Sequence, residues 1–179
     1  MMNVKKLIVQ MFIEIGYKEG FDNITINKIV KACNISRTTF YYHFKDIPDV
    51  IDYYLCEKIS SVANVCAGLK NMKKGVEYCA ENLIYNFPEC RKLLNSKWRV
   101  QTEVYLHEHW RNYAKKMISS NRKGVPIIEE ERKFLTEFLS GAICDYIIYG
   151  DLQEISAQVF AEQFSLLLNA RHAMMEKRN

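Results

Sequence analysis

Apolar residues recur in this chain at the spacing of a helix face, and few residues interrupt that pattern. In the first segment they fall three and four positions apart, at Val4, Leu7, Ile8, Met11, Phe12 and Ile15. This spacing places them on one side of an α-helix. Only 7 glycines and 3 prolines occur among the 179 residues, and no stretch sustains the alternation of a β-strand. The sequence therefore predicts an all-α protein.

Two short helices are predicted after this first segment, separated by a tight turn. Residues 23–25 provide a helix cap, and the helix they open must end near Cys33 and Asn34, because Asn tolerates the left-handed backbone of a turn. Ser36 predicts the cap of the next helix, which runs to about Phe44. This order is that of a helix-turn-helix, whose second helix enters the major groove of DNA.

The charge pattern of this region favours DNA. No acidic residue lies between Asp22 and Asp46, whereas basic residues occur there at Lys28, Lys31, Arg37 and Lys45. Phosphates repel carboxylates and attract cations, so this bias suits docking on a duplex. The alternative is a small polar helix whose tyrosines cover a core.

The stretch from Ile24 to Phe44 resembles the DNA-binding head of the TetR family of bacterial transcriptional regulators. The positions that fit are Thr25, Ile29, Ile35, Ser36, Thr39, Phe40, Tyr41 and Phe44. Ile47 departs from the pattern, because the family commonly has a phosphate-contacting lysine there, and Lys45 is the candidate replacement. The stretch 37–46 also resembles a subgroup that includes the dihydroxyacetone kinase regulator DhaS, an activator that works with a partner protein.

The resemblance and side-chain chemistry together assign roles within the head. The candidate DNA contacts are Thr25, Asn27, Ser36, Arg37, Thr38, Thr39, Tyr41, Tyr42, His43 and Lys45. The candidates for phosphates are Thr25, Tyr41 and His43, while Ser36 and Thr39 would cap the recognition helix and reach the DNA backbone. The candidates for base edges are Asn27, Arg37, Thr38 and Tyr42, and the Arg37 guanidinium suits the two acceptors of guanine. The alternative for each residue is a solvated surface side chain.

Residues 1–46 are thus predicted to form a helix-turn-helix DNA-binding domain, and residues 47–179 a helical regulatory and dimerisation domain. The motif Asp46-Ile47-Pro48-Asp49 opens a fourth helix, since proline and acids suit a first turn. In the family this helix links the head to the body. Further helices are predicted near 71–86, 88–96, 97–119, 127–149 and 154–175, with a loop at 121–126.

The last two predicted helices are apolar over more than half of their circumference, so each must bury two sides. One side can face the chain's own core and the other a second copy, and the resemblance implies a two-fold dimer through this pair. The candidate interface residues are Phe138, Ala142, Tyr146, Phe160, Phe164 and Leu168. The alternative is a central core helix in a monomer.

Residues 71–119 are rich in aromatic side chains, which is typical of either a ligand pocket or plain core packing. The candidate pocket residues are Tyr85, Trp98, Tyr105 and His109. The resemblance implies that such a pocket binds a small-molecule effector.

Other classes of protein find little support in the sequence. The longest uncharged run, 59–69, has 11 residues and is too short to cross a membrane, and no signal peptide is evident, so a cytoplasmic protein is expected. The six cysteines have no zinc-ligand spacing, and we expect them to be reduced. No catalytic or cofactor motif is present, so neither an enzyme nor a cofactor is predicted.

We therefore expect a homodimeric regulator that binds a palindromic operator in double-stranded DNA and acts as a repressor controlled by a small molecule. The alternative is a regulator like DhaS, whose body docks a partner protein or coactivator. Neither hypothesis involves a membrane.

Overall fold

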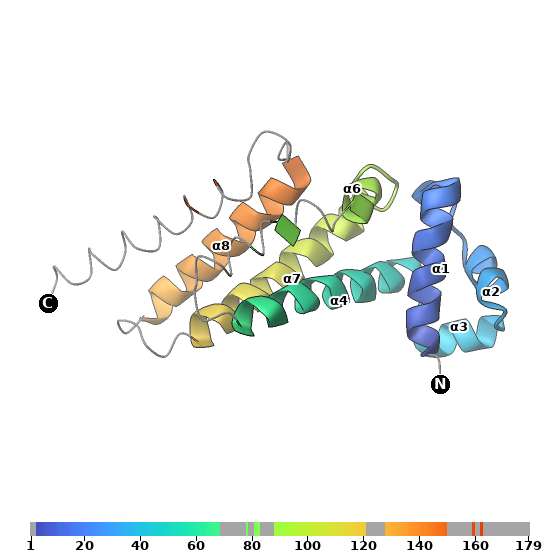
Figure 1. The fold of residues 1–179 in the computed structure, drawn as a ribbon, viewed down its shortest axis with the longest axis horizontal. Coiled ribbons are helices and arrows are strands. Elements are labelled where there is room, and N and C mark those ends of the chain that lie inside the picture. The colour runs from blue at the N-terminus through green and yellow to red at the C-terminus, as the bar shows by residue number, and fades with distance from the viewer. Residues whose placement is uncertain are drawn as a thin grey trace, which may run out of the picture. The chain divides into compact units, whose positions relative to one another are not determined.

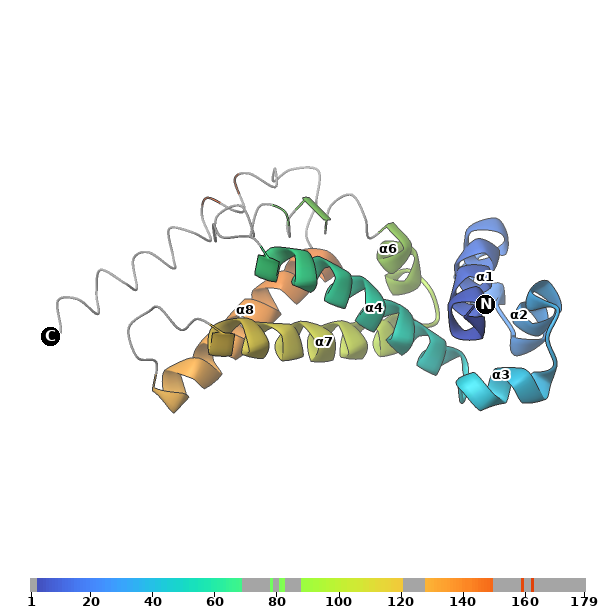
Figure 2. The ribbon, with the colours of Figure 1, turned by 60° about the horizontal axis from the view of Figure 1, so that its bottom comes forward.

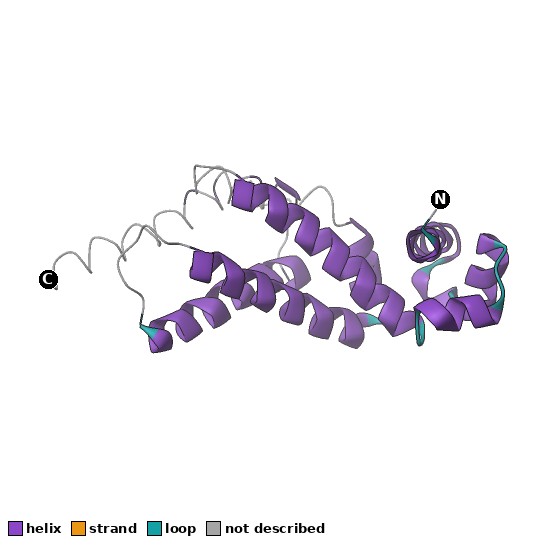
Figure 3. Ribbon diagram, turned by 90° about the horizontal axis from the view of Figure 1, so that it is seen from below, coloured by secondary structure: helices purple, strands orange, loops and turns teal. Residues whose placement is uncertain are grey.

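Every described element of the protein is a helix, as drawn in Figure 3. The structure is a computed structural model that describes residues 3–68, 78, 81–82, 88–120, 128–149, 159 and 162. The predicted all-α class is confirmed. The chain divides into two compact units, the first made of residues 1–57 and 89–106 and the second of residues 58–88 and 107–179. The domain boundary at residue 46 stays a prediction.

The first unit begins with three helices around a small core (Figure 1). They are α1 (Val4–Glu19), α2 (Ile26–Cys33) and α3 (Arg37–His43). The core between them is apolar and comes from all three helices: Ile8, Phe12, Ile29, Val30, Cys33 and Phe40 are buried. The helical spacing in the sequence thus predicted α1 and the side that it buries, on which Ile8 and Phe12 lie.

The turns of the head form where the sequence predicted them. Thr25 caps α2 by accepting a hydrogen bond from the backbone N of Lys28 at 3.3 Å. Asn34 ends that helix in the left-handed conformation, with φ 52° and ψ 46°. Ser36 caps α3 by accepting from the backbone N of Thr39 at 3.0 Å.

Gly16 lets α1 approach the next turn closely. After α1, a short 3₁₀ turn, η1 (Phe21–Asn23), carries the buried ring of Phe21 back against that helix. A Cβ atom at Gly16 would lie only 2.4 Å from this ring. The ring also packs on Phe12, with centroids 5.4 Å apart, so the space that a larger residue would need is already filled.

Helix α4 (Ile47–Gly68) begins at the predicted motif. Asp46 Oδ1 accepts from the backbone N of Asp49 at 2.9 Å, and Asp49 Oδ2 accepts from the backbone N of Lys45 at 2.8 Å. These two bonds satisfy backbone donors at the helix start and just before it.

Helix α6 (Pro88–Leu94) is joined to the head through Glu89. The Tyr54 hydroxyl on α4 donates to Glu89 Oε2 at 3.1 Å, and Tyr17 on α1 is also hydrogen-bonded to this carboxylate. Burial, together with the Glu89 charge and hydrogen bond, raises the pKa of both tyrosines, so both hydroxyls stay protonated donors. One carboxylate thus holds α1, α4 and α6 together.

The turn after α6 is bonded to η1. The backbone N of Lys97 donates to Asp22 Oδ1 at 2.6 Å and its Nζ donates to the Asp22 carbonyl at 2.6 Å, while Trp98 Nε1 donates to the Phe21 carbonyl at 3.0 Å. Because Lys97 and Trp98 belong to this turn, α7 (Arg99–Ser120) begins at Arg99 and the predicted start at residue 97 is wrong.

In the second unit, α7 lies beside α8 (Glu129–Tyr149), as Figure 2 shows. Ala114 and Ile118 form a buried cluster with Leu139, against which Leu135 packs. At the edge of this contact Arg111 and Glu137 form an ion pair at 3.0 Å. Helix α8 begins two residues after its predicted start at 127. Outside the described residues lies the predicted loop at 121–126. The same holds, apart from a few residues, for the predicted helices at 71–86 and 154–175.

Candidate nucleic-acid interface

Helix α3 exposes one continuous polar face. Arg37, Thr38, Tyr41 and Tyr42 are all exposed, and at about 100° per residue they span an arc of roughly 140°. The opposite side is held by Phe40 and Phe44, which are 0% and 2% exposed. These two rings therefore anchor the helix on the core of the head.

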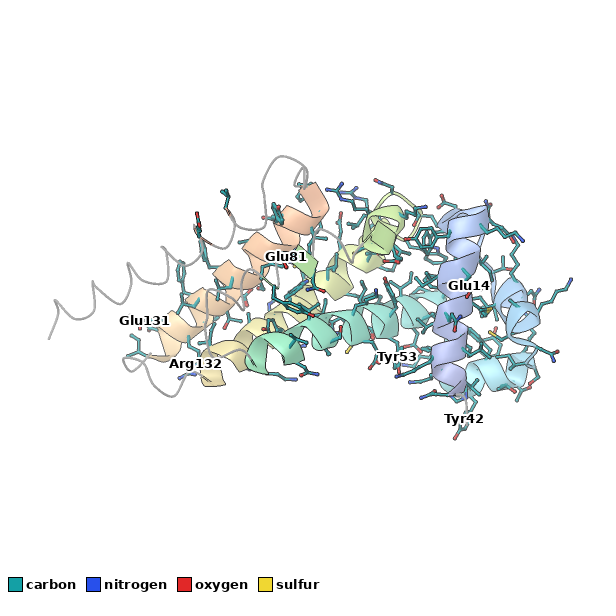
Figure 4. All side chains as sticks on the ribbon, viewed as in Figure 1. Glu14, Tyr42, Tyr53, Glu81, Glu131 and Arg132 are labelled. Atoms are coloured by element: carbon teal, nitrogen blue, oxygen red, sulfur yellow. The ribbon has the colours of Figure 1, made fainter. Side chains whose placement is uncertain are left out.

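The two tyrosines of this face rest on aromatic neighbours. Tyr41 contacts the buried ring of Phe40 edge to face, with centroids 5.7 Å apart, and Tyr42 meets the half-buried ring of His43 in the same way at 5.0 Å. Tyr42 is 84% exposed and projects from the end of the head where α1 begins (Figure 4). Its ring is therefore accessible to a partner molecule, and each of the two tyrosines has one aromatic contact within the helix.

Three of the candidate hydroxyls are used within the helix caps. The oxygens of Thr25 and Ser36 accept backbone N–H groups, and the hydroxyls of Ser36 and Thr39 share a hydrogen bond of 2.8 Å. A hydroxyl that accepts through a lone pair still has a proton to donate. The caps thus orient these groups, and the Thr25 hydroxyl keeps a proton that it can donate.

The basic residues around α3 differ in whether an acidic residue pairs with them. Lys28 forms an ion pair with Glu19 at 2.6 Å. The hydrogen bond from Lys28 and its positive charge hold the pKa of the Glu19 carboxyl below its usual range. Lys31, Arg37 and Lys45 are exposed, and none of them is within ion-pair distance of a carboxylate in the described part of the chain. Asn27 is also exposed and adds an uncharged amide to the same region.

Ile47 is buried, at 7% exposed, in the first turn of α4. Its side chain is buried against the core of the unit, so this position does not supply the charge that the resemblance expects. Lys45 is exposed and its backbone is fixed by Asp49. Lys45 stays the predicted replacement for the phosphate-contacting lysine that the family commonly has at position 47.

Cys33 lies beneath the turn between α2 and α3. The thiol is buried and its Sγ donates to the Leu7 carbonyl at 3.8 Å. Burial raises the pKa of this thiol, so less of the reactive thiolate forms.

Among the described residues, no group of His, Cys, Asp and Glu could hold a metal ion.

The candidate pocket residues have different environments. Trp98 uses its indole N–H on the Phe21 carbonyl and so ties the head to the turn before α7. Tyr105 and His109 are half-buried on α7, and Tyr85 lies outside the described residues. The sequence did not single out Trp110, which is fully buried and whose Nε1 has no hydrogen-bond acceptor among the described residues.

The candidate interface residues on α8 are divided between surface and core. Phe138 is 48% exposed and stacks on Phe134, which is 66% exposed, with ring centroids 5.9 Å apart. Ala142 is exposed as well, whereas Tyr146 is buried within its own chain. The interface candidates Phe160, Phe164 and Leu168 lie outside the described residues.

None of the helices in the described ranges is long and apolar enough to span a membrane.

Sequence reasoning missed the residues that fix the head from a distance. Lys97 and Glu89 contact partners 75 and 35 positions away, and no local pattern marks such pairs. Lys5 on α1 has distant partners as well, because its ammonium contacts the rings of Phe44 and Tyr53. The sequence pattern that was available, the lack of acidic residues in 23–45, describes the exposed surface of the head. It says nothing of the distant residues that hold the head in place.

Comparisons with known proteins agree with this geometry. Residues 9–52 match the profile described as bacterial regulatory proteins, tetR family, and residues 70–169 match one described as a transcriptional regulator C-terminal region. Among curated protein sequences, none matches the chain significantly.

Two solved structures share the fold over nearly the whole chain. The dihydroxyacetone kinase operon activator DhaS is similar with a TM-score of 0.68 and 17% identity, over 95% of this chain and 96% of that one. The fatty acid degradation regulator FadR from Bacillus halodurans is similar with a TM-score of 0.61 and 12% identity, over 94% and 95% of the two chains. At such identities the likeness concerns the fold alone.

Proposed function

The chain belongs to the TetR family of bacterial transcriptional regulators, and we propose that it is a homodimer that binds a palindromic operator and represses transcription until a small molecule releases it. The observation that carries this proposal is the exposed face of α3. Arg37, Thr38, Tyr41 and Tyr42 lie together on that face, in a segment without acids. Such a face can dock on phosphates and read base edges.

In this proposal two copies present their α3 helices to successive turns of one face of the duplex. A two-fold dimer requires a palindromic site, with half-sites about 34–36 Å apart. Arg37 lies in the first turn of α3, the part of a recognition helix that meets base edges. Thr25, His43 and Lys45 would then fix the register on the backbone.

Control by a small molecule requires an effector that binds the conformation unsuited to DNA more tightly than the DNA-bound one. The coupling is reciprocal, so the operator must weaken the effector to the same degree. The indole N–H of Trp110 is buried and has no acceptor among the described residues. It supports a polar ligand in the body, since a buried donor left unpaired costs about 1–3 kcal/mol. A carbonyl or carboxylate oxygen would satisfy this donor.

A second candidate is an activator whose body docks a partner protein. It is favoured by the burial of Ile47, which removes one expected phosphate contact and so weakens unassisted DNA binding. The name of DhaS, an operon activator, is in keeping with this reading.

An electrophoretic shift experiment separates the two candidates. The purified chain is mixed with the intergenic DNA upstream of its own gene and with a scrambled duplex, over a range of salt concentrations. Tight, salt-dependent binding to the first duplex alone supports the repressor. A shift that needs a second protein supports the activator, and equal binding to both duplexes contradicts either reading.

A further inference from the structure

Lys5, in the first turn of α1, is seated between two aromatic rings of the head. Its Nζ lies 5.2 Å from the ring centroid of Phe44 and 4.8 Å from that of Tyr53. The two rings meet edge to face, with centroids 5.6 Å apart and an interplanar angle of 77°. Ring faces attract an ammonium group at such distances, so the two rings favour this position of the flexible side chain.

The rings of Phe44 and Tyr53 form the seat of Lys5, and they do not neutralise its charge. Within the described parts of the chain, no carboxylate forms an ion pair with it, in contrast to Lys28, which is bonded to Glu19 at 2.6 Å. Aromatic faces attract the cation but offer no strong hydrogen-bond acceptor, and an ammonium has three N–H donors. Lys5 therefore presents a positioned charge whose donors can bind an anion.

The seat lies at the end of the recognition helix. Phe44 is the C-terminal cap of α3 and directly precedes Lys45. The first turn of α1 lies beside α3 in Figure 1, and Tyr42 projects from the same end of the head in Figure 4. The neighbouring side chain at which the family resemblance expects a lysine, Ile47, is buried.

We propose that Lys5 is a phosphate contact of the DNA-binding head and supplies, from α1, the charge that Ile47 does not. A lysine suits this role because its compact ammonium binds phosphate as a point charge. Phe44 and Tyr53 act as positioning residues that hold the ammonium toward the duplex. The inference rests on the proposed function, since it assumes that α3 docks on DNA.

The test compares Lys5→Gln with Lys5→Arg and with the control Lys18→Gln. Lys18 lies on the same helix about 20 Å away, at 1.5 Å of rise per residue, so its variant removes the same charge far from the seat. The probe is a duplex that the parent protein selects from a random pool, and the measurement is the slope of log affinity against log salt concentration.

Lys5→Gln should make the slope of a dimer shallower by about 2, since each phosphate contact contributes about 0.9. Lys5→Arg and Lys18→Gln should keep the parent slope. An unchanged slope in Lys5→Gln, or an equal change in Lys18→Gln, overturns the proposal. If the parent selects no sequence, the proposed function fails, and the same comparison on a random duplex still tests the phosphate contact.

A second pair of variants tests the seat itself. Tyr53→Phe keeps the ring and should bind as the parent does. Tyr53→Leu removes the ring and should weaken binding to selected and scrambled duplexes by the same factor. If Tyr53→Leu binds both duplexes like the parent while its thermal unfolding is unaltered, the rings do not position Lys5 and that part of the proposal is wrong.

Discussion

Arg37 and Tyr41 stand one turn apart on the exposed face of α3, and we expect their loss to affect DNA binding in different ways. Arg37→Ala should cost about 1–3 kcal/mol per half-site and relax the preference at one base pair, because a bidentate contact to guanine is lost. Tyr41→Phe should weaken all sequences alike and keep the salt slope, because the hydroxyl displaces no counterion.

These two effects are measured by titrating selected and scrambled duplexes with each variant. Both side chains are exposed, so thermal unfolding serves as the control and should not change. If Arg37→Ala discriminates between the duplexes as well as the parent does, Arg37 does not read a base.

Cys33 is close to the recognition helix, yet we expect oxidants to leave DNA binding intact. Its thiol is buried and its pKa is raised by burial, so at neutral pH it has even less thiolate than an exposed cysteine, and the thiolate is the reactive form. Mild oxidant should change DNA affinity by no more than about twofold. Mass-mapped alkylation should also modify Cys33 more slowly than the half-buried Cys56.

A large loss of affinity that dithiothreitol reverses would make one of the six cysteines a redox switch, with Cys33 beside the recognition helix as the first candidate. The half-buried Cys56 on α4 provides the comparison within the same chain.

At the scale of an element, α1 depends on a glycine in its last turn. Gly16→Ala should lower the free energy of unfolding by about 1–3 kcal/mol, the usual cost of overpacking, because the new Cβ would meet the Phe21 ring at 2.4 Å. Gly141→Ala on α8 is the matched control. Among the described residues of one chain, no heavy atom lies within 4 Å of its added Cβ, so within a single chain helix propensity alone should raise stability by up to about 1 kcal/mol.

Denaturant unfolding of both variants measures these opposite signs. If Gly16→Ala proves as stable as the parent, the close packing of α1 on η1 is not present in solution.

The elements also show what the sequence could and could not predict. Thr25, Asn34 and Ser36 act on backbone groups a few residues away, so local patterns were enough to place α2, the turn and α3. The start of α7 was missed, because Lys97 and Trp98 are held by η1 and a local pattern carries no information about so distant a partner. For the same reason the sequence identified the exposed face of α3 but not the seat of Lys5.

At the scale of the whole molecule, we expect the dimer to depend on the exposed rings of α8. Replacing both Phe134 and Phe138 with Glu should bring the mass in light scattering to the 21.1 kDa of one chain, because charge cannot be buried against a second copy without a partner. Both rings are solvent-exposed within the chain, so the variant should still fold.

Phe138→Leu is the control and should stay dimeric, since it keeps an apolar surface. A soluble double variant whose mass is still that of two chains would place the interface elsewhere, and retained far-ultraviolet circular dichroism would distinguish loss of the dimer from loss of the fold.

The hydrogen bonds from Lys97 and Trp98 to η1 have a consequence for the order of synthesis. Their donors follow their acceptors by 75 and 77 positions, and a chain leaves the ribosome from its N-terminus. The three helices of the head are therefore made long before the groups that tie η1 down. A nascent chain that ends after α4 contains the whole helix-turn-helix but lacks these bonds and the Glu89 carboxylate. The head is finished only when translation has passed the start of α7, so an interrupted chain does not carry a head as firmly held as that of the complete protein.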